Sequence, residues 1–527
     1  MSESFQRIIS IIRVETLFRF RRVTAVVTFL IVASAVYFIV PENSTGRTLI
    51  QIDHGRALYT SAAVALGTGM FCTLFLSLIG FYIVSNSLRR DILTRTGLVL
   101  AATPVTNAEY IVGKFFGNVL YLTAVMLVCM TSSMVMFLIR GEANLEPLTF
   151  LSIYSWLVIP TIAFCSAIAI TFEAFPLLSG RFGDVLFFFV WATLLGSSAV
   201  FLDNGGQLNW LALMDIVGIV PIIGFLQDHF HTSSISIGST SYDTAISPVV
   251  LNEIPLSGKL LGQRCSTLVL PLALLFMARL WFHRFNPTKV KFSVRQTKKN
   301  ILTRVNLLLK PATRLLQPFA RIGSAHSQQA TLLNAVRTDV FTTLLLSPFA
   351  IIAIIVFAII SLSVDISALH SGVLPAIAIA IVIAVADIVT RDHVAGMMNL
   401  LFTAPHLKPK YILWKCISAL IIVLCFTLIP LMRLYFEVPN AALSLLIGSM
   451  LITSAAVGLG MLAKSQKPFI AIFLMLLYIT LNANDAPVFD FIGVYGKATP
   501  DIHFGYALIS VLMIVGAHLK YKSELRT

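Results

Sequence analysis

The chain has 527 residues, of which 57% are hydrophobic and only 12% are charged. An ordinary soluble domain carries about 25% charged residues, so this composition excludes a soluble enzyme and a soluble binding module. The formal net charge of +14 raises the question of a nucleic-acid partner, which the positions of the basic residues answer below.

Apolar runs near 20 residues, the length that crosses a bilayer as a helix, recur along the whole chain. They precede or follow short polar stretches and predict an all-α integral membrane protein with about 12 transmembrane helices. The arginine-rich stretch FQRIISIIRVETLFRFRR before the first run indicates an amphipathic helix at the membrane surface. The predicted spans are 23–40, 57–84, 115–139, 148–172, 184–202, 266–283, 344–364, 373–388, 412–436, 441–463, 468–483 and 503–519.

The basic residues are distributed unevenly between alternate connecting segments. With the N-terminus in the cytoplasm, most of the 38 lysines and arginines fall in cytoplasmic segments. The outer segments then hold only Arg47, Arg56, Arg140, Lys259, Arg264, Arg433 and Lys497. This positive-inside bias predicts that both termini are cytoplasmic in a bacterial cytoplasmic (inner) membrane. The excess of positive charge therefore indicates the membrane topology and contact with anionic lipids. A nucleic-acid partner is not expected.

The chain divides near its middle. We predict a first six-helix half over 1–283, with a long outer loop at 203–263, and a second half over 338–527. A basic cytoplasmic linker, 284–337, contains no Asp or Glu and joins them. The outer loop carries an Asp228-His229-x-His231 cluster, which we interpret as solvated loop histidines, because metal sites need three or four ligands in tight geometry. The six cysteines form no CxxC pair and are expected to be buried apolar residues.

A polar segment recurs in the two halves, at 89–114 and 390–415. A shift of 301 residues aligns identical residues in RRDILTRTGLVLAATPVTNAEYIVGK and TRDHVAGMMNLLFTAPHLKPKYILWK. Each copy joins the second span of its half to the third, which predicts a 6+6 parallel tandem repeat, a pseudo-dimer about an axis along the membrane normal. The aligned pairs are Arg90 and Arg391, Asp91 and Asp392, Leu100 and Leu401, Pro104 and Pro405, Tyr110 and Tyr411, Ile111 and Ile412, and Lys114 and Lys415.

Each copy starts with Arg-Asp at a span end, continues as an amphipathic stretch and breaks at a proline. This pattern predicts a short helix parallel to the membrane that another protein can bind. We expect Lys114 and Lys415, at the start of the next span, to reach the lipid headgroups. The stretch around Arg337 and Asp339 is similar to that around Arg13 and Glu15, and both are expected to be helices leading into a six-span half.

The chain lacks the residues that would power transport by itself. It contains no GxxxxGK[ST] phosphate-binding loop. The intramembrane carboxylates that would mark an ion pathway, Glu173, Asp184 and Asp387, all fall at predicted cytoplasmic span ends. We identify no catalytic set and no cofactor site, so we expect a transport subunit without enzymatic activity of its own.

The segment GLVLAATPVTNAEYIVGKFFGN, together with LLFTAPHLKPKYILWK, resembles the loop after the second span in ABC-2 type exporter permeases. The resemblance implies that two six-span half-transporters are fused here and that each loop is a coupling helix. It implies two copies of a separate ABC ATPase, which would bind ATP-Mg, and a transported substrate that the sequence does not identify. Leu98 and Asn399 stand where family members often carry an acidic residue, and Trp414 aligns with Gly113. The expected ATPase-coupling residues are the six aligned pairs other than Ile111 and Ile412.

Two other classes remain open at this stage. A secondary transporter built from two six-span repeats would depend on a proton or sodium gradient and would bind no ATPase. A membrane-embedded enzyme would show a set of catalytic residues on one side of the membrane. An assembly scaffold would show no transport.

Overall fold

The computed structural model describes residues 3–94, 96–175, 177–178, 180–203, 214–232, 234–251, 258–282, 331–397, 407–482 and 487–526. The chain forms two compact units, and each is described by itself. Unit 1 comprises Met1–Ser179 and Phe187–Gln296, and unit 2 comprises Gly180–Leu186 and Thr297–Thr527. The predicted linker lies outside the described residues as far as residue 330, and its last residues belong to a helix.

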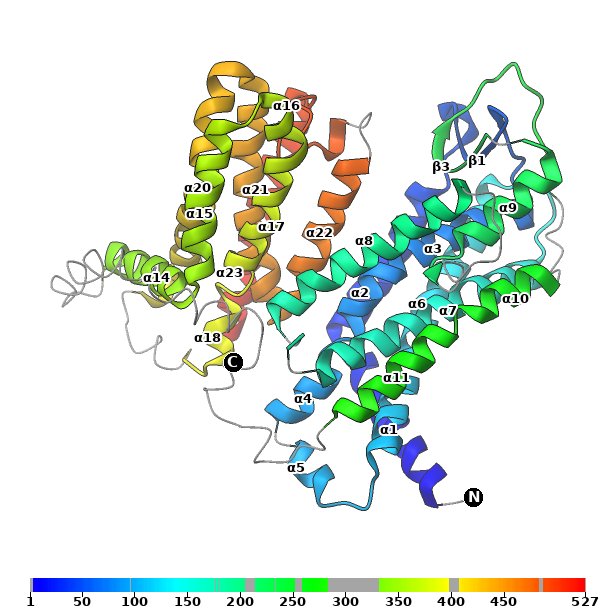
Figure 1. Cartoon of the computed structure of the whole chain (residues 1–527), viewed down its shortest axis with the longest axis horizontal. Helices are drawn as coiled ribbons and strands as arrows, with labels where there is room; N and C mark the ends of the chain where they lie inside the picture. Colours follow the sequence, from blue (N-terminus) through cyan, green and yellow to red (C-terminus); the bar gives the residue numbers. More distant parts are fainter. Residues whose placement is uncertain are drawn as a thin grey trace. The chain divides into compact units, whose positions relative to one another are not determined.

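Unit 1 begins with two helices that meet at a bend of 70°. The first, α1, is the predicted amphipathic helix, and α2 is the first apolar run. Short helices α4 and α5 form the first polar loop, at the end of the unit opposite the strands (Figure 1). The helices are α1 (Glu3–Phe20), α2 (Val23–Ile39), α3 (Ser61–Val84), α4 (Ser87–Leu93), α5 (Thr96–Ala101), α6 (Asn107–Arg140), α7 (Pro147–Ala174), α8 (Arg181–Asp203), α9 (Ile219–Phe230), α10 (Gly258–Ser266) and α11 (Val269–Trp281).

Unit 2 has the same kind of beginning, because α14 and α15 meet at a bend of 88°. The second polar loop starts with α18 and is described as far as residue 397. The helices are α14 (Leu332–Leu346), α15 (Pro348–Ser363), α16 (Ile366–Ala368), the π-helix η5 (Leu369–Val373), α17 (Leu374–Val385), α18 (Thr390–Val394), α20 (Tyr411–Glu437), α21 (Pro439–Ala463), α22 (Lys467–Asn482) and α23 (Pro500–Arg526). Single 3-10 turns occur at Asn43–Thr45, Lys408–Lys410 and Pro487–Phe489.

Every predicted span overlaps a helix. Within the described residues, eight helices are long and apolar enough to cross a membrane, and the number rises to 10 when each bent pair is one span. The helix α22 has 16 residues and falls short of the length test. The all-α membrane class is therefore supported, whereas the number of 12 spans stays a prediction.

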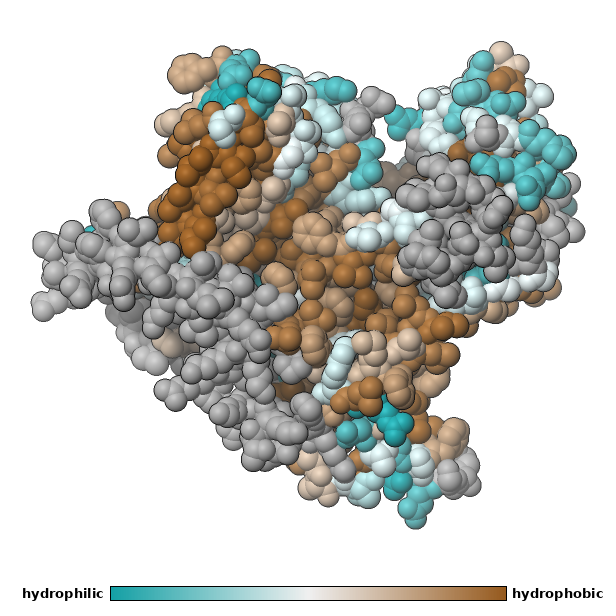
Figure 2. All heavy atoms as spheres, viewed as in Figure 1, coloured by the Kyte–Doolittle hydropathy of each residue, from teal (hydrophilic) through white to brown (hydrophobic). Residues whose placement is uncertain are grey.

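The interior of unit 1 is built on α3 and α7. Their most apolar windows are 78% and 89% buried, whereas those of α11 and α23 are only 22% and 17% buried. Side chains such as Leu272 on α11 and Phe504 on α23 point outward, with 67% and 71% of their surface exposed. Hydrophobic side chains cover the sides of the helices in Figure 2, for example along α15 and α20. This is the arrangement that a lipid environment stabilises.

A small antiparallel sheet closes one end of unit 1, which the sequence analysis missed. The strands β1 (Arg47–Ile52), β2 (Gly55–Arg56) and β3 (Ile235–Ser241) lie in the order β2-β1-β3. Asp53 and His54 both adopt positive φ, which a two-residue hairpin turn requires. The pairing of Ile50 with Ile237 joins the segment after the first span to the long loop 203–263.

Beside this sheet, a bidentate ion pair connects two helix-linking segments. Arg56 donates from Nη1 and Nη2 to the two carboxylate oxygens of Glu142, at 2.8 Å each. The Tyr59 N–H donates to the same carboxylate at 3.0 Å. Partial burial opposes ionisation of Glu142, but these hydrogen bonds outweigh it, so the pKa of the Glu142 carboxyl is lowered.

Replacement of Glu142 tests how its carboxylate contributes to the free energy of unfolding at different pH values. Because the folded-state pKa of Glu142 is lowered, its contribution is fully present above the ordinary pKa of about 4.3 and is lost as the pH falls through the folded value. We expect Glu142→Gln to cost about 0.5 kcal/mol at pH 7, a small value because solvent screens this partly exposed pair. Thermal unfolding of both proteins, followed from pH 7 down to pH 3, should show the difference shrinking in acid. A difference that is constant with pH would contradict this assignment.

Candidate functional site: two buried charge clusters at the polar loops

The first polar loop is shaped by caps at both of its ends. The helix α3 ends at Ser85, and Asn86 then adopts a left-handed conformation. The Glu173 carboxylate at the end of α7 accepts from the backbone N–H groups of Asn86, Leu88 and Arg89, which α4 leaves unpaired. At the other end, Thr106 and Glu109 form a reciprocal capping box that starts α6. The capping box explains the spacing of Thr106 and Glu109 in the first copy of the recurring segment.

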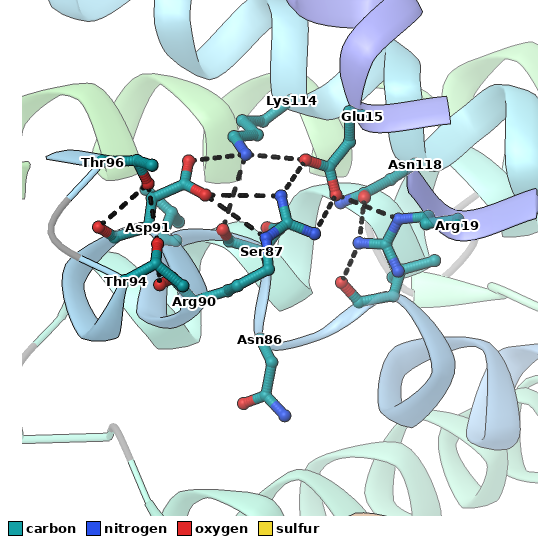
Figure 3. Close-up of polar contacts among 12 residues, drawn as sticks. Glu15, Arg19, Asn86, Ser87, Arg90, Asp91, Thr94, Thr96, Lys114 and Asn118 are labelled. Atoms are coloured by element: carbon teal, nitrogen blue, oxygen red, sulfur yellow. Dashed lines mark hydrogen bonds and ion pairs between the residues drawn. The ribbon is translucent and has the colours of Figure 1, made fainter. Parts of the chain in front are cut away.

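The charges of the first loop that recur in the second loop point into the protein. The Lys114 ammonium lies between two carboxylates, 2.6 Å from Glu15 Oε2 and 2.7 Å from Asp91 Oδ2 (Figure 3). Arg90 Nη2 also contacts Glu15 Oε2, at 2.6 Å. The Tyr110 hydroxyl donates to Asp91 Oδ2 at 2.7 Å. We call Glu15, Arg90, Asp91, Tyr110 and Lys114 the first cluster.

The first cluster joins three helices at one point. Glu15 is carried by α1, Arg90 and Asp91 by α4, and Tyr110 and Lys114 by α6. Glu15 and Lys114 are 1% and 4% exposed, so these charges are almost completely removed from water. Because each buried charge needs an opposite charge nearby, displacement of any one helix leaves its partners unpaired.

The second polar loop has the same contacts. Lys415 lies between Asp339, at 3.2 Å, and Asp392, at 2.7 Å. Arg391 pairs with Asp339, and the Tyr411 hydroxyl donates to Asp392 Oδ2 at 3.0 Å. We call Asp339, Arg391, Asp392, Tyr411 and Lys415 the second cluster, and it joins α14, α18 and α20 in unit 2.

An aromatic ring on the last helix of each half completes the likeness. The Tyr110 ring stacks on Phe282, just after α11, with centroids 5.3 Å apart. The Tyr411 ring stacks on Tyr521 of α23 at the same separation of 5.3 Å. The recurring tyrosine therefore has two contacts in each unit: its hydroxyl holds an aspartate and its ring holds the last helix.

The predicted position of the two lysines at the lipid headgroups is wrong. Lys114 and Lys415 are 4% and 1% exposed and lie in the carboxylate clusters. The long side chain reaches inward because Glu15 and Asp339 supply a buried opposite charge on α1 and α14. Glu15 and Asp339 are aligned in the sequence, but their pairing with the loops was not predicted.

The remaining predicted residues have different positions. Leu100 packs on the apolar cluster that includes Leu88, Tyr110 and Ile170, whereas Pro104 is exposed. Leu401 and Pro405 lie outside the described residues. The six charged residues and two tyrosines of the prediction are thus brought together in two sets, within which Arg, Asp and Lys pair inside the chain.

The tip of the first loop, from α5 to Pro104, exposes apolar side chains. Leu98 and Val99 on α5 are 37% and 69% exposed, and Ala102 and Pro104 beside them are exposed as well. In the described part of the second loop, Val394 is 63% exposed. The charged residues of the first loop therefore hold its shape, and its apolar tip remains available for contact.

Comparison with known proteins gives one match. Residues 57–242 match the family model of the ABC-2 family transporter proteins. The match covers α3 to β3 and includes the first polar loop, but it extends to neither α1 nor the second half of the chain. No curated protein and no solved structure matches the chain significantly. With the long apolar helices, the match supports a transmembrane transport protein of the permease type.

Removal of one cation from each cluster tests the energetic role of the clusters. Loss of one partner of a buried ion pair costs about 3–5 kcal/mol. We expect Lys415→Met to destabilise by about 3 kcal/mol and Lys114→Met by less, because Glu15 also pairs with Arg19, at 3.1 Å, as well as with Arg90. Thermal or denaturant unfolding in a fixed detergent measures both.

The matched control is Lys410→Met, which removes the same charge from an exposed position five residues before Lys415. We expect no measurable change in that variant. Equal stability of the Lys415→Met and Lys410→Met proteins would contradict a structural role for the second cluster.

Proposed function

We propose that the protein is the membrane permease of an ATP-binding-cassette exporter, with two six-span halves fused in one chain. The observation that carries the proposal is the recurrence of one cluster, residue for residue, at the loop after the second span of each unit. The first of these loops lies in the segment that matches the ABC-2 family transporter proteins.

A second recurring contact supports the doubling. Arg140 Nη1, at the end of α6, donates to the carbonyl oxygens of Tyr37 and Val40 at the end of α2. Arg433 Nη1, on α20, donates to the carbonyls of Ser361 and Val364 at the end of α15. The accepting residues are aligned by the same shift of 324 that aligns Glu15 with Asp339. In both units, an arginine on the third span thus binds carbonyl oxygens at the end of the first span.

The energy for transport would come from a separate ABC ATPase, since the sequence contains no phosphate-binding loop. Two copies, with ATP-Mg bound to them, would contact the two polar loops on the cytoplasmic side. On the first loop, Leu98, Val99, Ala102 and Pro104 offer an apolar contact surface. An apolar contact agrees with the absence of the acidic residue that related loops often carry at position 98.

Movement of a loop would reach the spans through the clusters. When the ATPase pulls on α4 and α5, the first cluster transfers the displacement to α1 and to the start of α6 without a flexible connection. The coupling requires that the ATPase bind one arrangement of the loops more tightly than the other. The two units would then alternate between inward and outward access for a substrate that stays unidentified.

The docking surface can be tested with one exposed side chain. Val99→Glu places a charge on the tip of α5 at a position that is already 69% exposed, so the fold should not suffer. We expect at least a tenfold loss of binding to the partner ABC ATPase, measured by co-purification and by stimulation of its ATP hydrolysis in vesicles. The control is Val250→Glu, at a position 47% exposed in the loop 203–263.

Two results would overturn the proposal. Wild-type protein that binds no ATPase, and transports only when a proton or sodium gradient is imposed, would establish a secondary transporter. Equal ATPase binding by the Val99→Glu and Val250→Glu variants would exclude α5 as the docking surface.

A further inference from the structure

The two helices that precede the first spans, α1 and α14, are held by unequal sets of contacts. We propose that α14 separates from α20, the helix of its third span, more readily than α1 separates from α6. The inference goes beyond the proposed function, because it concerns a difference between the two units that exists without any partner.

An ion pair near the N-terminus of α1 is the first difference. Arg7 Nη2 lies 3.1 Å from Glu109 Oε1, which ties the beginning of α1 to the beginning of α6. The aligned residues in unit 2 are Thr331 and Lys410, shifted by 324 and 301. Both partners are replaced, so the described residues of unit 2 have no ion pair at this place.

The second difference lies at the other end of α1. Arg19 donates to the carbonyl oxygens of Ile83 and Val84, at 3.1 and 2.7 Å, and to Asn118 Oδ1 at 2.7 Å. It therefore binds the C-terminal end of α3 and the body of α6 at once (Figure 3). The aligned residues are Thr343, which accepts from Arg391, and Ala419, which offers no polar side chain.

Close packing is the third difference. A Cβ atom on Gly113 would lie 2.7 Å from Ile11 Cγ2, and one on Gly117 would lie 2.8 Å from Glu15 Cβ. These two glycines, four residues apart, therefore let α1 approach α6 closely, as small residues do between membrane helices. The aligned residues in α20 are Trp414 and Ser418, which carry side chains where α6 has none.

The fourth difference is the cap at the start of the loop helix. In unit 1, Glu173 accepts three backbone N–H groups at the start of α4. In unit 2, the start of α18 is held by backbone hydrogen bonds within its own turn, from the Ile388 and Arg391 N–H groups to the carbonyl oxygens of Val385 and Asp387. Together these differences give α1 more tertiary contacts than α14 has around an otherwise equivalent cluster. In unit 2, the Thr343–Arg391 hydrogen bond is what supplements the ion pairs of Asp339.

Hydrogen–deuterium exchange of the full chain in nanodiscs measures the difference directly. The matched segments are residues 12–19 of α1 and 336–343 of α14, which are aligned and carry the two cluster carboxylates. We expect amides of the second segment to exchange at least about tenfold faster, since charge-assisted hydrogen bonds are the stronger ones and unit 2 lacks two sets of them.

Residue exchange between the units tests the cause. The double variant Arg7→Thr/Arg19→Thr gives α1 the residues of α14 and should raise exchange in 12–19 by about tenfold or more. The control Arg13→Thr makes the same change at an exposed position of the same helix and should leave exchange within twofold. The reciprocal variant Thr343→Arg/Ala419→Asn should slow exchange in 336–343, a gain that misfolding cannot imitate.

Equal exchange of the two wild-type segments would overturn the inference. An effect of Arg7→Thr/Arg19→Thr no larger than that of Arg13→Thr would overturn the assigned cause. The measurement uses neither ATP nor a partner, so its result is independent of the proposed transport function. With that function, the inference means that the two ATPase docking sites are mechanically unequal.

Discussion

A charge that is removed from water must have an opposite charge beside it, and this constraint organises both units. Glu15 and Asp339 are buried carboxylates on helices that lie outside the polar loops in sequence. Each binds an arginine from the loop and a lysine from the next span, so one carboxylate fixes the relation of three helices. Full ion pairs of this kind hold a specific geometry even where their net contribution to stability is small.

The same constraint explains why the loops are polar in a chain with so few charges. The charged residues that recur in both loops pair inside the protein, and the tip of the first loop exposes apolar side chains, as at Val99. The base of such a loop is fixed by ion pairs, and its tip presents an apolar contact surface. Both properties suit a segment that must transmit displacement between a partner and the membrane spans.

The helices were predictable from the sequence because apolar runs of bilayer length have few alternatives. The recurrence of Arg-Asp, Tyr and Lys was visible as well, since it is local and ungapped. The pairing of Lys114 with Glu15 was not, because the two residues are far apart in sequence and the general rule for lysine at a span end points outward. The signal was present in the aligned Glu15 and Asp339, but only the fold shows that they face the loops.

The sheet was missed for a related reason. The local hairpin partner of β1 is β2, which has only two residues, and β3 pairs with a segment distant in sequence, so the sheet has little local signal. β1 also follows directly on an apolar run, where a short outer connection is the ordinary expectation. The two helix caps were also not predicted. The Glu173 cap joins residues far apart in sequence, and the Glu109 capping box can be recognised only once the start of α6 is known.

The paired replacements between the units have a consequence for the history of the chain. Arg19 and Asn118 are a donor and its acceptor, and the aligned residues Thr343 and Ala419 reproduce neither member of the pair. If one member alone were exchanged between the halves, a buried polar group would remain without its partner, and such a group costs more than the pair contributes. Divergence of the halves would thus proceed by coupled steps, and a chimera that joins one half's lead-in helix to the other half's third span would be defective although each part is native.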